Sequence, residues 1–94
     1  MSEQPEQPQA LDQLRGLGPR SVGWLAQVGI TSVEQLRGTG AVDAYERLVR
    51  AGLAVSLNML WALEGACSDR DWRDVARTDR TRLLWELDLR GIAP

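Results

Sequence analysis

The chain has 94 residues, which is enough for one small domain, and its formal net charge is -2. Its basic residues are 11 arginines, with no lysine, and 13 acidic residues outnumber them. A domain without excess positive charge has little long-range attraction for phosphate, which argues against tight non-specific binding of DNA.

The sequence also lacks side chains that most catalytic and metal sites need. It contains no histidine, so it has no His general base and no Ser–His or Cys–His nucleophilic pair. The single cysteine, Cys67, follows an apolar helical run and is expected to act as a small buried hydrophobe. One cysteine cannot form an internal disulfide, which suits a reducing cytoplasm. We therefore expect a cytoplasmic, non-enzymatic protein with no cofactor and no metal.

The polar and apolar segments suggest one domain preceded by a tail. Residues 1–10 are polar and contain proline, which predicts a disordered tail, and residues 11–94 predict a single helical domain. The tail is acidic, and no apolar run approaches the ~18 residues of a membrane span, so neither a signal peptide nor a membrane contact is expected.

The N-terminal half is divided by glycines and helix-capping residues. Pro19 suits the first position of a helix, and Gly29 is a suitable stop for the same helix. Thr31 lies three residues before Glu34, a spacing that forms a capping box and starts another helix. The pattern predicts helices at about residues 10–15, 19–28, 31–36 and 41–51.

The C-terminal half contains the most apolar segment, LNMLWALEGAC, which begins after the capping residue Ser56. This segment is apolar nearly all round, so we expect it to be the central buried helix. Asn58 and Glu64 interrupt it, and we expect both to point inward and to be satisfied by backbone or arginine partners. A short turn, DWRDVA, follows, and Thr78 begins the last helix. Short connections throughout predict an all-α, compact bundle of five to seven short helices.

Apolar positions that share a helix face predict the core. The expected core residues are Leu17, Val22, Leu25, Ile30, Leu36, Leu57, Leu60, Trp61, Leu84 and Leu87.

Residues 14–36, LRGLGPRSVGWLAQVGITSVEQL, have the pattern of a helix-hairpin-helix motif. Gly16 and Gly18 permit backbone angles that other residues avoid, and Leu17 fills the corner between them. Backbone amides at the following helix start, reinforced by Arg20, can hold a phosphate oxygen of DNA. Few basic residues lie nearby, so the alternative is a purely structural corner, and the weak electrostatics favour that alternative.

Two of the four tryptophans, Trp24 and Trp85, lie off the main apolar stripes of their helices. An exposed tryptophan is typical of a protein interface. Packing of the hairpin against the last helix would also explain both positions, and we favour that packing while keeping both residues as candidates for an interface.

Several segments together resemble the C-terminal domain of the TfoX/Sxy family. They are GLGPRSVGWLAQVGITSVEQLR, GAVDAYERL, VSLNMLWALEGA and DWRDVA, and the resemblance covers residues 11–87. Its most distinctive part is SLNMLWALE at residues 56–64. The resemblance implies a helix-hairpin-helix-like α-fold and a link to the regulation of natural competence, the uptake of DNA by bacteria. Full-length members carry a separate, mostly β N-terminal domain, and we expect this chain to present the C-terminal domain without it.

These observations lead to one functional expectation and one alternative. We expect a non-catalytic module that binds a protein partner in the regulation of transcription or competence. The alternative is weak, sequence-independent binding of DNA through the hairpin, with Gly16, Gly18 and Arg20 at the phosphate.

Overall fold

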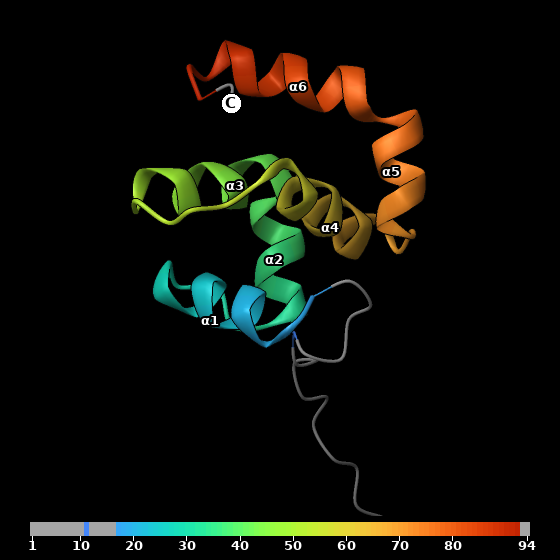
Figure 1. Cartoon of the computed structure of the whole chain (residues 1–94). Coiled ribbons are helices and arrows are strands. Elements are labelled where there is room, and N and C mark those ends of the chain that lie inside the picture. Colours follow the sequence, from blue (N-terminus) through green and yellow to red (C-terminus); the bar gives the residue numbers. More distant parts are fainter. Residues whose placement is uncertain (1–10, 12–16, 93–94) are drawn as a thin grey trace, which may run out of the picture.

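The computed structural model describes residue 11 and residues 17–92 of the chain. Within these residues the helices are α1 Pro19–Gln27, α2 Val33–Thr39, α3 Ala41–Arg50, α4 Leu57–Ser68, α5 Trp72–Thr78 and α6 Arg80–Leu89. The connections between them are short, and the prediction of an all-α bundle is confirmed (Figure 1). The expected tail at residues 1–10 lies outside the described residues, as does the helix expected at residues 10–15 apart from Leu11, which is buried.

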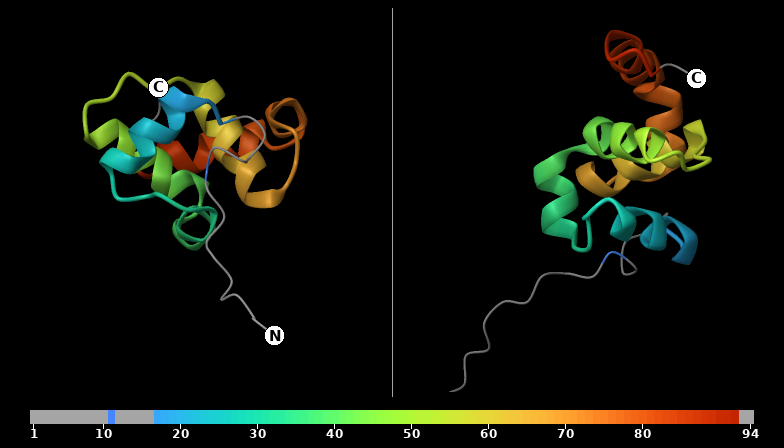
Figure 2. Two further views of the ribbon diagram at one scale, coloured as in Figure 1. Left: turned by 90° about the horizontal axis from the view of Figure 1, so that it is seen from below. Right: turned by 90° about the vertical axis from the view of Figure 1, so that its left-hand side faces the viewer.

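The helices are stacked in three tiers, with α3 and α4 in the middle (Figure 1). Helix α1 lies on one side of this middle tier and α6 lies on the opposite side, as the second view in Figure 2 also shows. Helix α4 packs against α2, α3 and α5, whereas α6 packs against α3 and α5. The arrangement gives α4 neighbours on several sides and leaves α6 at the edge of the molecule.

The central position of α4 is confirmed by the burial of its side chains. Leu60 and Leu63 are completely buried, and Trp61 is 3% exposed. Most of the expected core is buried, namely Leu17, Leu25, Ile30, Leu36, Leu60, Trp61 and Leu87. The other expected members, Val22, Leu57 and Leu84, are partly buried and pack against this core from its edge.

Helices α1, α3 and α6 end in the same way at a glycine, and the stop at Gly29 was expected from the sequence. Gly29 after α1, Gly52 after α3 and Gly91 after α6 have φ angles of 85°, 81° and 71°, in the left-handed region that favours glycine. In each case the amide of the next residue bonds back to the last turn of the helix, for example Ile30 N to Leu25 O at 2.9 Å. This is the Schellman arrangement, and it also turns an apolar side chain back toward the core.

Two expected helix starts are wrong by one or two residues. Ser32, not Thr31, caps α2, because its hydroxyl accepts a hydrogen bond from the Gln35 amide at 3.1 Å. The Gln35 side chain in turn accepts from the Thr31 amide at 2.7 Å, so the start of α2 has a variant of the capping box in which Gln35 reaches the residue before the cap. The last helix begins at Arg80 after the capping residue Asp79, and Thr78 ends α5.

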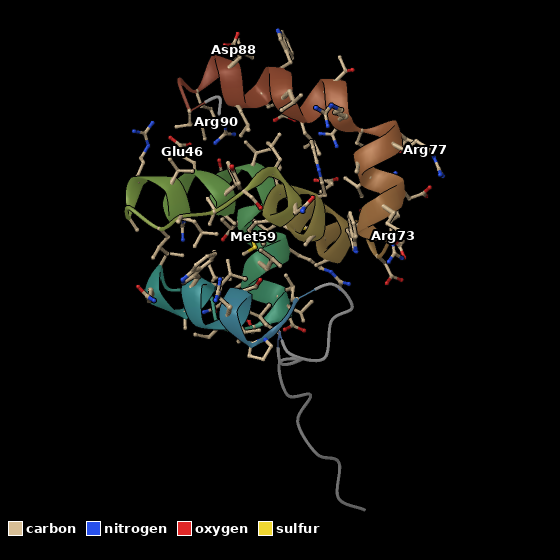
Figure 3. The ribbon with its side chains drawn as sticks, in the orientation of Figure 1. Glu46, Met59, Arg73, Arg77, Asp88 and Arg90 are labelled. Atoms are coloured by element: carbon tan, nitrogen blue, oxygen red, sulfur yellow. The ribbon has the colours of Figure 1, made fainter. Side chains whose placement is uncertain are left out.

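Helix α6 is held to the rest of the domain by two groups of charged side chains. Arg90 binds Asp43 and Glu46 of α3, and the Arg90–Glu46 pair, 2.9 Å long, is visible between the two helices in Figure 3. At the other end of α6, Arg70 holds Asp79 through two hydrogen bonds of 3.0 and 3.1 Å. Asp79 also accepts a bond from Arg82, so one carboxylate ties the start of α6 to the loop before α5.

Candidate functional site

Two of the candidate residues, Arg20 and Trp24, lie together on α1 at the edge of a hollow of about 290 Å³. The Arg20 guanidinium lies over the Trp24 ring, 5.8 Å from its centroid, within the range of a cation–π contact. The hollow lies between α1 and the start of α4, and its lining residues are Arg20, Ser21, Trp24, Ala54, Ser56, Asn58, Met59 and Ala62.

The polar side of the hollow is unusually free of internal partners. Among the described residues, the side chains of Ser21, Ser56 and Asn58 form no hydrogen bond with the protein, and Arg20 forms no ion pair. No carboxylate lines the hollow within the part of the chain that the structure describes. The lining therefore carries one positive charge in a chain whose net charge is -2.

The apolar side of the hollow is made by packed side chains. Met59 is 7% exposed and lies between α4 and α1 in Figure 3, and Ala62, one turn later on α4, also lines the hollow. Trp24 is partly buried against the core. A ligand here would meet an aromatic ring and a thioether beside a guanidinium, which is the mixed chemistry of many recognition pockets.

Gly18 of the hairpin does not need the special backbone angles expected from the sequence. Gly18 has φ -89° and ψ 179°, an extended conformation that any residue adopts, and a Cβ built on it would meet nothing within 4 Å. Position 18 therefore requires glycine neither for its backbone angles nor for space. Pro19, the first residue of α1, offers no amide to a phosphate. Gly16 lies outside the described residues.

Trp85 lies far from Trp24, so the expected packing of the hairpin against the last helix is wrong. Helices α1 and α6 are on opposite sides of the middle tier in both Figures 1 and 2. Trp85 is 62% exposed and Leu89, one turn further along α6, is 66% exposed. These are the exposed large hydrophobic side chains among the described residues, and they form a second candidate surface, the outer face of α6.

The two polar residues inside the central helix behave differently from each other. Glu64 is half-buried and pairs with Arg82 at 3.3 Å, as expected of an acid with an arginine partner. Asn58 is exposed and lines the hollow, so the expectation that it points inward is wrong. It lies in the first turn of α4, on the side of the helix that faces the hollow.

The thiol of Cys67 has the properties of a packing residue. It is partly buried, and its Sγ lies 3.7 Å from the Leu36 carbonyl oxygen. Burial and the nearby Glu64 carboxylate raise its pKa to about 11, so little thiolate is present at neutral pH. Among the described residues, no cluster of cysteines and carboxylates could hold a metal ion, and no helix is long and apolar enough to cross a membrane.

Sequence reasoning found Arg20 and Trp24 but missed the rest of the hollow. The hollow is also lined by Ser21 of α1 and by Ser56 and Met59, which lie more than 30 residues further along the chain. These two segments meet only because α1 packs beside the start of α4. One signal was present, because a polar Asn58 in the most apolar helix of the chain indicates a helix start that faces solvent.

Fold and surface together define a small all-α domain with two exposed features, the hollow beside α1 and the outer face of α6. The sequence profile described as "TfoX C-terminal domain" matches residues 7–87, and the chain belongs to this family. The chain is 33% identical over 64 residues to the DNA transformation protein TfoX of Haemophilus influenzae, which covers 68% of this chain and 30% of that protein. The chain thus spans less than a third of the length of this relative.

The fold is also similar to that of a solved structure. An uncharacterized protein from Listeria monocytogenes superposes with a TM-score of 0.77 over 87% of this chain and 94% of that one, at 25% sequence identity. The overall fold is therefore shared with a second protein of distant sequence.

Proposed function

We propose that this domain is a non-catalytic interaction module that binds a protein partner in the regulation of DNA transformation. The family and the similarity to a DNA transformation protein support the process. The absence of histidine and the high pKa of the Cys67 thiol support a role without catalysis. The cytoplasm is the setting in which such a regulator acts.

The observation that carries the proposal is the outer face of α6. Trp85 and Leu89 are four residues apart on one helix, so they lie on the same face. Both are more than 60% exposed, and Asp88 beside them also points away from the domain (Figure 3). Adjacent exposed apolar side chains of this size are typical of protein interaction sites, and tryptophan is among the residues enriched at binding hot spots.

The distribution of arginines favours a protein over DNA as the partner. Most arginines are already paired with a carboxylate within 4.0 Å: Arg50, Arg70, Arg73, Arg77, Arg82 and Arg90. Among the described residues, Arg20, Arg37, Arg47 and Arg80 have no ion pair, and they belong to four different helices. Binding of DNA depends on several phosphate contacts at once, which so few dispersed charges supply poorly.

An affinity capture from the native cytoplasm, with and without nuclease, tests this function. We expect the wild-type chain to retain a protein after nuclease treatment and the Trp85→Ser/Leu89→Ser variant to lose it. Arg77→Ser, on the outer side of α5, is the matched surface control and should retain it. The same substitutions at the chromosomal locus should lower transformation frequency for the α6 variant only. A captured protein that depends on DNA, or equal capture by both variants, would remove support for the proposal.

A further inference from the structure

The hollow between α1 and α4 is a second surface feature, which the outer face of α6 does not account for. We propose that it binds a short acidic segment of a partner protein, with a carboxylate at Arg20 and a neighbouring large apolar side chain against Trp24 and Met59. This inference rests on the proposed function and makes one of its contacts specific.

The first argument is the charge of the lining. Arg20 is the charged residue that lines the hollow, it has no ion pair among the described residues, and no described carboxylate lies beside it. Elsewhere in the domain, exposed arginines commonly have a carboxylate partner, for example Arg77 with Asp74 at 2.6 Å. A guanidinium that lacks an internal partner and faces a hollow is complementary to a carboxylate from another chain.

The second argument is the shape and polarity of the space. A volume of about 290 Å³ lies at the small end of ligand pockets, so it suits one or two side chains of a peptide. The Trp24 ring, Met59 and Ala62 give that space an apolar wall, and Ser21, Ser56 and Asn58 leave hydrogen-bonding groups free for a peptide backbone. An acidic residue next to a large apolar one satisfies both sides of the hollow.

The third argument is that the charged group is already positioned. The Arg20 guanidinium lies over the Trp24 ring, and the ring is itself held by the core. A long side chain that is restrained before binding loses less conformational entropy when a ligand arrives. A segment of nucleic acid would need further phosphate contacts, and the lining supplies one arginine.

The site can be tested by NMR, by titrating three peptides into the isotope-labelled full chain. Each peptide has about seven residues and blocked termini. The probe has Asp-Leu-Asp at its centre, and the matched controls have Asn-Leu-Asn and Asp-Gly-Asp. We expect the probe to shift the amides of Ser21 and Asn58 and the indole of Trp24. Each control should bind about tenfold more weakly, because one lacks the carboxylates and the other lacks the buried apolar side chain.

Two variants connect the binding to the hollow. Arg20→Glu and Ala54→Glu each place a carboxylate at its edge and should weaken the probe about tenfold, with an otherwise native spectrum. Arg47→Glu makes the same change of charge at an exposed arginine outside the hollow and should bind like the wild type.

Several outcomes would overturn the site. Equal binding of all three peptides, or chemical-shift changes outside the hollow, would do so. So would the absence of any chemical-shift change at about 1 mM probe, or tighter binding of a thymidine tetranucleotide than of the probe. The titration uses only the purified chain. If the α6 variant still captures the cellular partner, the proposed function loses its support while the titration stands. If Arg20→Glu still binds the probe, the hollow is not the site while the capture result stands.

Discussion

Helices α4 and α6 share an unusual sequence pattern but have opposite environments. In neither helix are the apolar side chains gathered on one face. Helix α4 has neighbours on several sides, and its residues Met59, Leu60, Trp61, Ala62 and Leu63 are all buried. Helix α6 has α3 and α5 beside it, so Leu83 and Leu87 are buried while Trp85 and Leu89 face outward.

The two helices differ in composition, because α4 is apolar nearly all round whereas α6 mixes five apolar residues with five polar or charged ones. A helix that is apolar nearly all round, such as α4, is stable in water only where other elements cover it on several sides. The domain buries residues 59–63 of α4, whereas it covers one side of α6. The apolar residues left over on α6 are therefore the ones for which an external partner is the simplest physical explanation.

The largest effect is expected for Leu60→Ala, which tests whether α4 is the buried helix of this comparison. Leu60 is completely buried, so its truncation removes apolar burial and leaves a cavity, and the free energy of unfolding should fall by about 2–5 kcal/mol. Denaturant unfolding followed by far-UV circular dichroism measures this loss. A variant that unfolds at the wild-type midpoint would show that α4 is not the centre of the core.

A second test concerns the contact between α4 and α5. A Cβ added to Gly65 would lie 2.6 Å from the Arg70 carbonyl oxygen and 3.4 Å from the Trp72 amide nitrogen. Because both atoms are backbone, Gly65→Ala must push α5 away and should cost about 1–3 kcal/mol. The matched control is Gly18→Ala, which has open space and ordinary backbone angles and should melt like the wild type. Equal melting temperatures for the two variants would contradict the close packing of α5 on α4.

A third test concerns the carboxylate that anchors the start of α6. Hydrogen bonds from Arg70, Thr78 and Arg82 lower the pKa of Asp79 well below its ordinary value of 3.8. The folded state therefore favours the charged form. The stabilisation is present at neutral pH and is lost as the pH falls below about 4, where the unfolded chain takes up the proton.

Asp79→Asn should lower the free energy of unfolding by about 1 kcal/mol at pH 7. The free energy of unfolding of this variant should also fall less steeply than that of the wild type between about pH 5 and pH 3. Asp88→Asn, on the outer side of α6, is the control for removing one negative charge from this helix (Figure 3). The test is to measure urea unfolding midpoints of the wild type and the variant across that pH range. Parallel curves for the wild type and Asp79→Asn would argue that the Asp79 carboxylate does not stabilise the start of α6.

The fold was largely predictable because it depends on local signals. Pro19 and Gly29 mark the ends of α1, and the nearly all-apolar segment after Ser56 marks α4 as central. The errors occurred where neighbouring residues compete for one role. Ser32 caps α2 instead of Thr31, and nothing in the local sequence distinguishes two adjacent hydroxyl side chains.

The candidate surfaces were predictable only in part, because they depend on how helices are placed in space. Arg20 and Trp24 could be selected from one helix, and their contact follows from spacing within that helix. The position of Ser56 and Asn58 opposite them depends on the packing of α1 beside the start of α4. The separation of Trp24 from Trp85 similarly depends on α3 and α4 lying between their helices.

The smallest expected effect on stability is that of Trp85→Ser on the exposed side of α6. The side chain is 62% exposed in the folded domain, so folding removes little of its surface from water. The free energy of unfolding should change by no more than about 0.5 kcal/mol, with an unchanged denaturant slope. Trp61→Ser, at a tryptophan that is 3% exposed, is the matched control and should destabilise the domain severely. A loss at Trp85 as large as that at Trp61 would mean that α6 is covered on both sides, and the contrast between the two helices would then disappear.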